Sequence, residues 1–111
     1  MSELHTLRCV ACEGGVPALT DKEIEPLLIQ VPKWQLNKDK KSITRRFTFR
    51  NFYHTMAFVN AIAWIANKEN HHPDMEVGFN YCVVNYSTHA IQGLTQNDFI
   101  CAAKIDTLDA N

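Results

Sequence analysis

Imidazole is the side chain best suited to proton transfer near neutral pH, and this sequence gathers three of its five histidines around one predicted hairpin. His71 and His72 precede the first strand of that hairpin, and His89 follows the second. We take Asn80-Tyr81 as the two-residue turn, since asparagine tolerates the positive φ that such turns need. This register places His72 opposite His89, with Cβ atoms about 5 Å apart. The sequence therefore predicts a proton-handling site at the open end of the hairpin.

The neighbouring residues indicate how two of these histidines are held. His71 lies near the C-terminus of a long helix predicted over residues 52–69, where the helix dipole favours a protonated imidazole. The residue before a proline is kept out of the α region, so Pro73 should hold His72 in an extended conformation. We expect both side chains to be oriented by the backbone around them.

Geometry alone leaves other interpretations of these histidines open. A histidine pair at a helix end is often only a polar cap, and cross-strand histidine pairs occur on ordinary surfaces. A catalytic zinc site is a more specific alternative. However, adjacent histidines rarely bind the same metal ion, and no further ligand pair has a spacing typical of zinc proteins. We therefore assign no metal to the site. His5 and His54 are expected to be structural or solvent-facing.

Alternating side chains predict four strands. Residues 34–36 form a short strand, and residues 42–49 alternate as expected for a half-buried strand. The hairpin strands lie within residues 75–87, where Cys82, Val84 and Tyr86 form part of one apolar face. These strands are expected to form one antiparallel sheet.

Capping signals predict three helices. Thr20 and Glu23 resemble a capping box, Asn51 can cap the long helix, and Thr95 with Asp98 can cap a last helix. Pro26 lies too deep in the first helix for a first-turn proline, so we expect that helix to start later or to be kinked. The order α-β-β-α-β-β-α implies an α+β domain, a four-stranded antiparallel sheet with about three helices packed on one face.

The long helix carries two adjacent apolar stripes. One is Phe52, Met56, Val59, Ala63 and Ala66, and the other is Phe58, Ile62 and Ile65. So wide an apolar surface suggests burial on two sides, by the sheet and by a partner helix. A homo-oligomer, either dimer or tetramer, would provide that partner.

Length and composition suit one small domain. We expect residues 1–19 to be an irregular N-terminal leader and residues 20–111 to be a single domain. The net charge of −1 gives no basic field for nucleic acid, and no apolar run approaches the roughly 18 residues that span a bilayer. With no secretory signal at the N-terminus, we expect a cytoplasmic protein with reduced thiols.

The leader carries a Cys9-x-x-Cys12 pair with His5 four residues upstream. Such a pair can bind a metal or act in redox chemistry, but a single pair with no second ligand pair is a weak signal. Metal binding there is left as an open alternative.

The chain resembles the pterin-4a-carbinolamine dehydratase family, and its leader looks like that of bacterial members. The resemblance runs from about Leu27 to Ile105. It includes Trp34 and the segment from Phe47 to Phe52. Its most specific part is the sequence Asn67-Lys68-Glu69-Asn70-His71-His72-Pro73, followed by Ser87-Thr88-His89 and then by Gly93-Leu94-Thr95-Gln96-Asn97-Asp98.

The resemblance implies a hydro-lyase that uses no metal or organic cofactor. The family removes water from 4a-hydroxytetrahydrobiopterin, the pterin-4a-carbinolamine that an aromatic amino-acid hydroxylase releases, and gives quinonoid dihydropterin. By analogy His71, His72 and His89 are catalytic: His72 holds the pterin and moves its proton, while His71 and His89 assist departure of the hydroxyl group. The expected substrate-binding residues are these histidines together with Asn70, Ser87, Thr88, Ala90, Trp34 and Asn67.

One departure from the family pattern concerns charge. Asn67 stands where the family usually has an ionisable residue, often glutamate, and Asn70 replaces an aspartate of animal relatives. A missing carboxylate would remove a partner that raises a histidine pKa. We therefore expect somewhat less basic histidines than in relatives.

Two alternative functions remain. One is a non-enzymatic role in protein contact, as in animal relatives that serve as dimerisation cofactors of a transcription factor. The other is a pterin step linked to molybdenum-cofactor metabolism.

Overall fold

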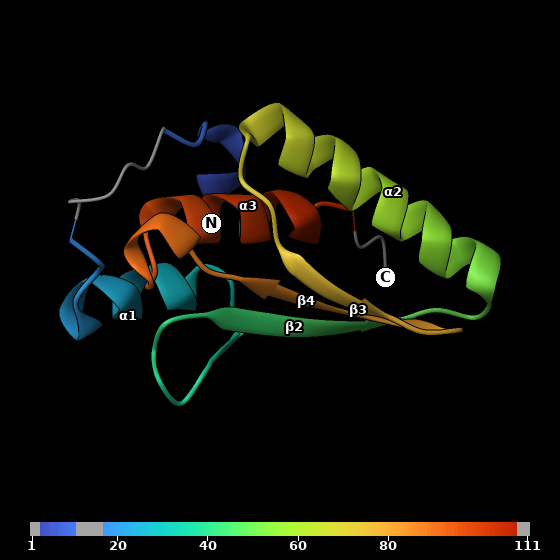
Figure 1. Cartoon of the computed structure of the whole chain (residues 1–111), viewed down its shortest axis with the longest axis horizontal. Coiled ribbons are helices and arrows are strands. Elements are labelled where there is room, and N and C mark those ends of the chain that lie inside the picture. The colour runs from blue at the N-terminus through green and yellow to red at the C-terminus, as the bar shows by residue number, and fades with distance from the viewer. Residues whose placement is uncertain (1–2, 11–16, 109–111) are drawn as a thin grey trace.

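The computed structural model describes residues 3–10 and 17–108, and it confirms the predicted α+β fold (Figure 1). Two short 3-10 turns are added to the predicted order. The elements are η1 (Leu4–Thr6), α1 (Asp21–Ile29), β1 (Gln35–Leu36), β2 (Ile43–Thr48), α2 (Phe52–Glu69), β3 (Asp74–Val77), β4 (Tyr81–Tyr86), η2 (His89–Ile91) and α3 (Gln96–Asp106). Helices α2 and α3 lie over one face of the sheet. No helix within the described ranges is long and apolar enough to cross a membrane.

The sheet is antiparallel with the strand order β1-β2-β4-β3. Along the central strand β4, buried Cys82, Val84 and Tyr86 alternate with half-buried residues. This is the period-2 pattern of a strand with one face on the core. Strand β3 is at the edge of the sheet, and all four of its residues are exposed.

The predicted hairpin register is wrong by two residues. Val77 pairs with Cys82 and Met75 with Val84, so the turn is at Phe79-Asn80 and not at Asn80-Tyr81. Tyr81 is excluded from the turn because its ring covers Gly78. The Tyr81 hydroxyl also donates to Glu76 Oε2, at 3.2 Å. Asn80 remains in the turn as its second residue, and Phe79 takes the place that was predicted for Tyr81.

The helix-capping predictions are confirmed. Thr20 and Glu23 form a capping box at the start of α1, which continues through Pro26. The Asn51 side chain accepts a hydrogen bond from the His54 backbone N–H at the start of α2. Thr95 is the N-cap of α3, and Asp98 accepts a hydrogen bond from its backbone N–H.

The two apolar stripes of α2 have different surroundings. Phe58 and Ile62 are buried in the core, with Ile65 half-buried beside them. In the other stripe Ala66 is buried, whereas Phe52 and Ala63 are exposed. The sheet therefore covers one stripe and leaves part of the other open.

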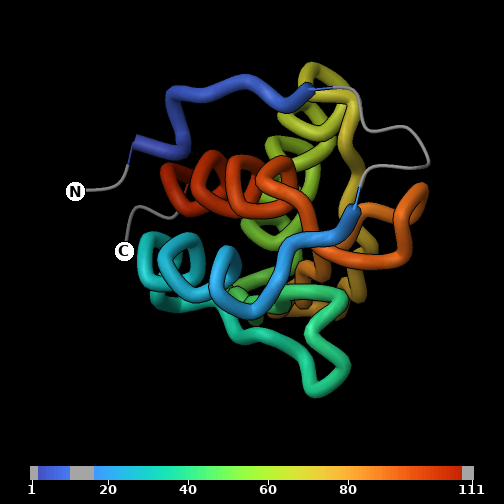
Figure 2. The backbone as a smooth tube through the Cα atoms, turned by 90° about the vertical axis from the view of Figure 1, so that its left-hand side faces the viewer, coloured from blue at the N-terminus to red at the C-terminus, as the bar shows by residue number. Residues whose placement is uncertain are grey.

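The N-terminal segment, residues 3–10, packs along α3 (Figure 2). Leu4 is buried in the core, and the Lys104 ammonium group donates to the backbone carbonyl of His5. These contacts fix the path of the chain up to Cys9, so the described part of the predicted leader is packed against the domain.

Replacing Gly78 by alanine tests the observed register. A Cβ at position 78 would collide with the Tyr81 ring. We expect Gly78→Ala to lower the free energy of unfolding by about 1–3 kcal/mol, the cost of overpacking, as measured by urea denaturation. In a Tyr81→Ala background the cost should fall by at least about 0.5 kcal/mol, because that substitution removes the ring with which the new Cβ collides. Equal costs in the two backgrounds would contradict the register.

Candidate functional site

The end of α2 directs two histidines away from the helix. Asn70 is the C-cap and adopts the left-handed conformation (φ 52°, ψ 41°), which asparagine tolerates better than most residues. The His71 backbone N–H then donates to the Ala66 carbonyl at 3.1 Å, which closes the helix. His71 and His72 therefore leave α2 at a defined angle, and Pro73 prevents the helix from continuing.

His71 is packed between an aromatic ring and a carboxylate. Its imidazole stacks on the Tyr86 ring, with centroids 5.5 Å apart and planes 6° apart. Its Nε2 donates to Asp98 Oδ1 at 2.6 Å, and the side chain is only 11% exposed. Burial by itself lowers the pKa of His71, but the hydrogen bond and the charge of Asp98 outweigh burial and raise that pKa. This pair favours a protonated His71.

The Asp98 side chain is fully buried and connects three parts of the chain. Beyond its bond to His71, its Oδ2 accepts from the Thr88 hydroxyl and from the Thr95 backbone N–H, both at 2.9 Å. Thr95 lies at the start of α3, and Thr88 lies just after β4. Three donors and a helix N-terminus compensate for burying the carboxylate group.

His89 is presented by a tight loop after β4. Thr88 and Gly93 form an isolated bridge, and Gln92 adopts a left-handed conformation, so the chain folds back over η2. A Cβ at Gly93 would lie 2.7 Å from the Ala18 Cβ, which explains a glycine there. His89 is largely exposed, and its Nε2 lies 3.5 Å from Asp74 Oδ2 at the start of β3.

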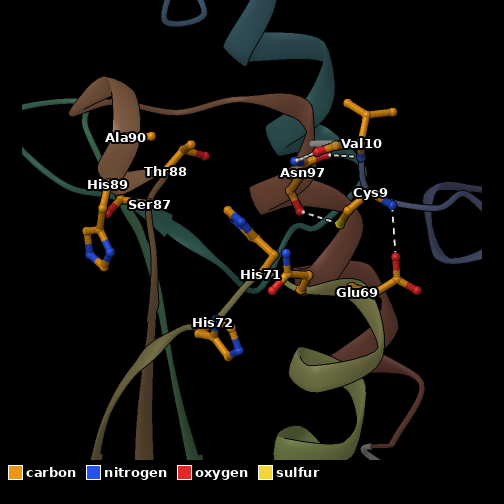
Figure 3. A pocket seen from close by; sticks show the side chains of 11 residues that line it. Cys9, Val10, Glu69, His71, His72, Ser87, Thr88, His89, Ala90 and Asn97 are labelled. Atoms are coloured by element: carbon orange, nitrogen blue, oxygen red, sulfur yellow. Dashed lines mark hydrogen bonds between the residues drawn. The ribbon is translucent and has the colours of Figure 1, made fainter. Parts of the chain in front are cut away.

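The three histidines border one pocket of about 390 Å³ (Figure 3). The observed register no longer places His72 directly opposite His89, yet both rings lie at the same opening. The pocket is lined by residues from the N-terminal segment, the end of α2, the loop after β4 and the start of α3. They are Cys9, Val10, Glu69, Asn70, His71, His72, Ser87, Thr88, His89, Ala90 and Asn97.

Seven of the nine site residues expected from the sequence line this pocket. Trp34 and Asn67 do not. Trp34 is buried in the core, where its Nε1–H donates to Asp106 Oδ1 at 2.8 Å. Asn67 is exposed on α2. His54 is also remote from the pocket, with its backbone N–H bonded to the cap residue Asn51.

Sequence reasoning missed several residues of the site. The sequence assigns Asp98 to a helix cap and to the family motif but not to the site residues, although an acidic residue shortly after His89 is a usable signal. Asn67 left the histidines without an obvious carboxylate partner, and Asp98 supplies one to His71. Cys9 and Val10 carry no periodic signal, because their place in the pocket depends on how the N-terminal segment packs.

The described part of the site holds no cluster of metal-ligating side chains. Within residues 3–10 and 17–108, no group of three His, Cys, Asp or Glu side chains could hold a metal ion. Cys12, the second residue of the Cys9-x-x-Cys12 pair, lies outside the described residues. The arrangement instead combines a carboxylate-paired imidazole with two exposed imidazoles, a set suited to moving protons on a bound ligand.

Comparison with known proteins shows which family the chain resembles. The family model described as pterin 4 alpha carbinolamine dehydratase matches residues 17–108. A Legionella pneumophila protein named "Putative pterin-4-alpha-carbinolamine dehydratase" is 60% identical over 108 residues, covering 96% of each chain. A Nitrosospira multiformis protein with the same name is 55% identical, covering 97% of this chain and 94% of its own.

Two solved structures resemble the fold. A transcriptional coactivator/pterin dehydratase from Brucella melitensis has a TM-score of 0.78 and 31% identity, covering 82% of this chain and 97% of its own. A pterin dehydratase-like RuBisCO assembly factor of the alpha-carboxysome has a TM-score of 0.62 and 22% identity, covering 71% of this chain and 92% of its own, and supports the fold alone. With most of its length matched by the family model and by close relatives, this chain belongs to the pterin-4-alpha-carbinolamine dehydratase family.

Proposed function

We propose that this protein dehydrates 4a-hydroxytetrahydropterin to quinonoid dihydropterin and water by histidine acid–base catalysis. The observation that carries the proposal is the convergence of His71, His72 and His89 on one pocket, with His71 paired to a buried carboxylate. Family membership supports the reaction class. From the resemblance to this family, we further propose that the substrate is 4a-hydroxytetrahydrobiopterin and that an aromatic amino-acid hydroxylase releases it.

The chemistry needs an acid and a base on one ligand. The C4a–O bond breaks with its electrons on oxygen, and an acid protonates that oxygen so that it leaves as water. A base removes the ring N–H proton, which completes the quinonoid double bonds without any change in oxidation state. The pocket supplies imidazoles for both steps.

We assign hydroxyl departure to His71 and His89. The Nε2 atom of His71 is taken by Asp98, so Nδ1 is the ring nitrogen left to donate to a substrate. Because the pKa of His71 is raised, its imidazole is more readily protonated and can donate that proton. His72, exposed on the other side of the opening, holds the pterin and moves its ring proton.

Neighbouring polar groups would orient the pterin ring. Asn70, Ser87 and Ala90 line the pocket beside the histidines, where backbone and side-chain groups can meet the ring edge. The Thr88 hydroxyl already donates to Asp98. We therefore propose that Thr88 acts chiefly by holding the loop that carries His89.

Replacing single histidines tests this site. We expect His72→Ala and His89→Ala to lower kcat/KM by about 10²-fold or more, because each removes a proton-transferring group. The measurement is the ultraviolet absorbance change of freshly generated 4a-hydroxytetrahydropterin. His54→Ala is the matched control, since His54 lies outside the pocket, and it should keep wild-type activity.

A folded wild-type protein that fails to accelerate the reaction would contradict the proposed function. Undiminished rates in both pocket variants would keep the reaction but contradict the site.

We also propose that the protein is a homo-oligomer, either dimer or tetramer. Phe52 on α2 is 52% exposed, and Val77 on the edge strand β3 is 39% exposed. An edge strand with apolar side chains and a helix with an uncovered apolar stripe are surfaces that association would cover. Such a face could also bind another protein, which is the alternative role.

Charged substitutions on this face test the assembly. We expect light scattering coupled to gel filtration to give a dimer or tetramer for the wild type. Phe52→Asp or Val77→Lys should reduce the measured mass, since each places a charge in the covered face. Ile29→Asp is the matched control, because Ile29 is 70% exposed on α1, and it should not change the mass. A monomeric wild type, or an equal effect of the control, would contradict the proposal.

A further inference from the structure

Two thiols that the proposed reaction does not use are in contact at the wall of the pocket. The Sγ atoms of Cys9 and Cys101 are 3.4 Å apart, although the two residues are 92 positions apart in the sequence. Cys9 lines the pocket, whereas Cys101 is fully buried in α3, one turn after Asp98. Cys9 is therefore half-buried at the border of the pocket, whereas Cys101 is enclosed.

The backbone on both sides of Cys9 is fixed, so this approach does not depend on a loose end. The Cys9 backbone N–H donates to Glu69 Oε1 at 2.8 Å (Figure 3). Next to it, the Val10 N–H donates to Asn97 Oδ1 at 3.0 Å, and Asn97 Nδ2 donates back to the Val10 carbonyl at 2.6 Å. These bonds hold Cys9 against α3, and a disulfide would need the sulfurs to approach from there to about 2.05 Å.

The hydrogen bond between the two thiols shifts their pKa values in opposite directions. The hydrogen bond with Cys101, followed by burial, raises the pKa of Cys9. The hydrogen bond with Cys9 lowers the pKa of Cys101, and the nearby charge of His71 lowers it further, against the effect of burial. Cys101 therefore gives up its proton more readily than Cys9 does, and the thiolate is the reactive form of cysteine.

We propose that Cys9 and Cys101 are a redox-sensitive pair that closes to a reversible disulfide and locks the N-terminal segment onto α3 at the pocket wall. The oxidant is a hydroperoxide small enough to enter the pocket. The inference rests on the thiol geometry and is independent of the dehydratase reaction.

The oxidation balances as a two-electron step. Cys9 passes its proton to Cys101 as its sulfur attacks hydrogen peroxide, takes an OH group and becomes a sulfenic acid; the departing hydroxide then takes up that proton and leaves as water. Cys101 then attacks the sulfenic sulfur, and the hydroxyl leaves as a second water. Overall, two thiols and one hydrogen peroxide become one disulfide and two waters, and a small thiol such as glutathione reverses the step by exchange.

Cys82 is the natural control. It is fully buried in β4, and burial raises its pKa to about 11, so it should be unreactive. Among the residues that the structure describes, the thiol hydrogen bond joins Cys9 to Cys101 and does not involve Cys82.

The test treats the reduced, full-length protein with stoichiometric hydrogen peroxide. We expect a mass loss of about 2 Da and a Cys9–Cys101 linked peptide in a non-reducing digest, both reversed by glutathione. The melting temperature should rise by on the order of 10 °C, because the bridge closes a long loop. Cys9→Ser and Cys101→Ser should each abolish these changes, whereas Cys82→Ala and Cys12→Ser should retain them.

Other products would overturn the inference. A Cys9–Cys12 linked peptide would show that the neighbouring cysteine is the true partner. An intermolecular bridge, or a gain of oxygen atoms without a bridge, would show that Cys9 and Cys101 do not close on each other. These outcomes are read on the wild-type protein, so they do not depend on any variant folding.

Discussion

The buried carboxylate of Asp98 is the interaction on which the arrangement of the pocket depends. It accepts hydrogen bonds from the His71 ring, the Thr88 hydroxyl and the Thr95 backbone. These donors come from the end of α2, the loop after β4 and the start of α3. A buried carboxylate without its donors is costly, so the three elements stay together to satisfy it. Packing of the core and assembly of the acid–base site therefore depend on the same group.

The remaining walls of the pocket follow from this junction. Asn70 turns the chain out of α2, so that His71 meets Asp98 and His72 reaches the opening. The loop held by Thr88 presents His89 from the other side. The N-terminal segment completes the wall with Cys9, which rests on α3 beside the same junction. Four separate stretches of chain thus share one small site, and a shift in any of them would change its shape.

Much of this arrangement could be predicted because it is decided locally. The caps at Asn51 and Thr95 and the alternation along β4 each depend on a few neighbouring residues, and all are observed. The pairing of His71 with Asp98, 27 positions apart, depends on tertiary packing, so the sequence showed both residues without showing their contact. The hairpin register failed for a similar reason: the Tyr81 ring covers Gly78, a cross-strand contact that turn propensities do not include.

The most direct test of this account is a pH titration of the His71 imidazole by NMR, in the wild type and in Asp98→Asn. The account predicts that His71 in the folded wild type titrates above the ordinary histidine value of about 6.5, because the Asp98 carboxylate stabilises its protonated form. Asp98→Asn should lower that pKa while the protein stays folded. A His71 pKa below the ordinary value in the wild type, or one that Asp98→Asn leaves unchanged, would contradict the claim that this pair supplies the acid of the site.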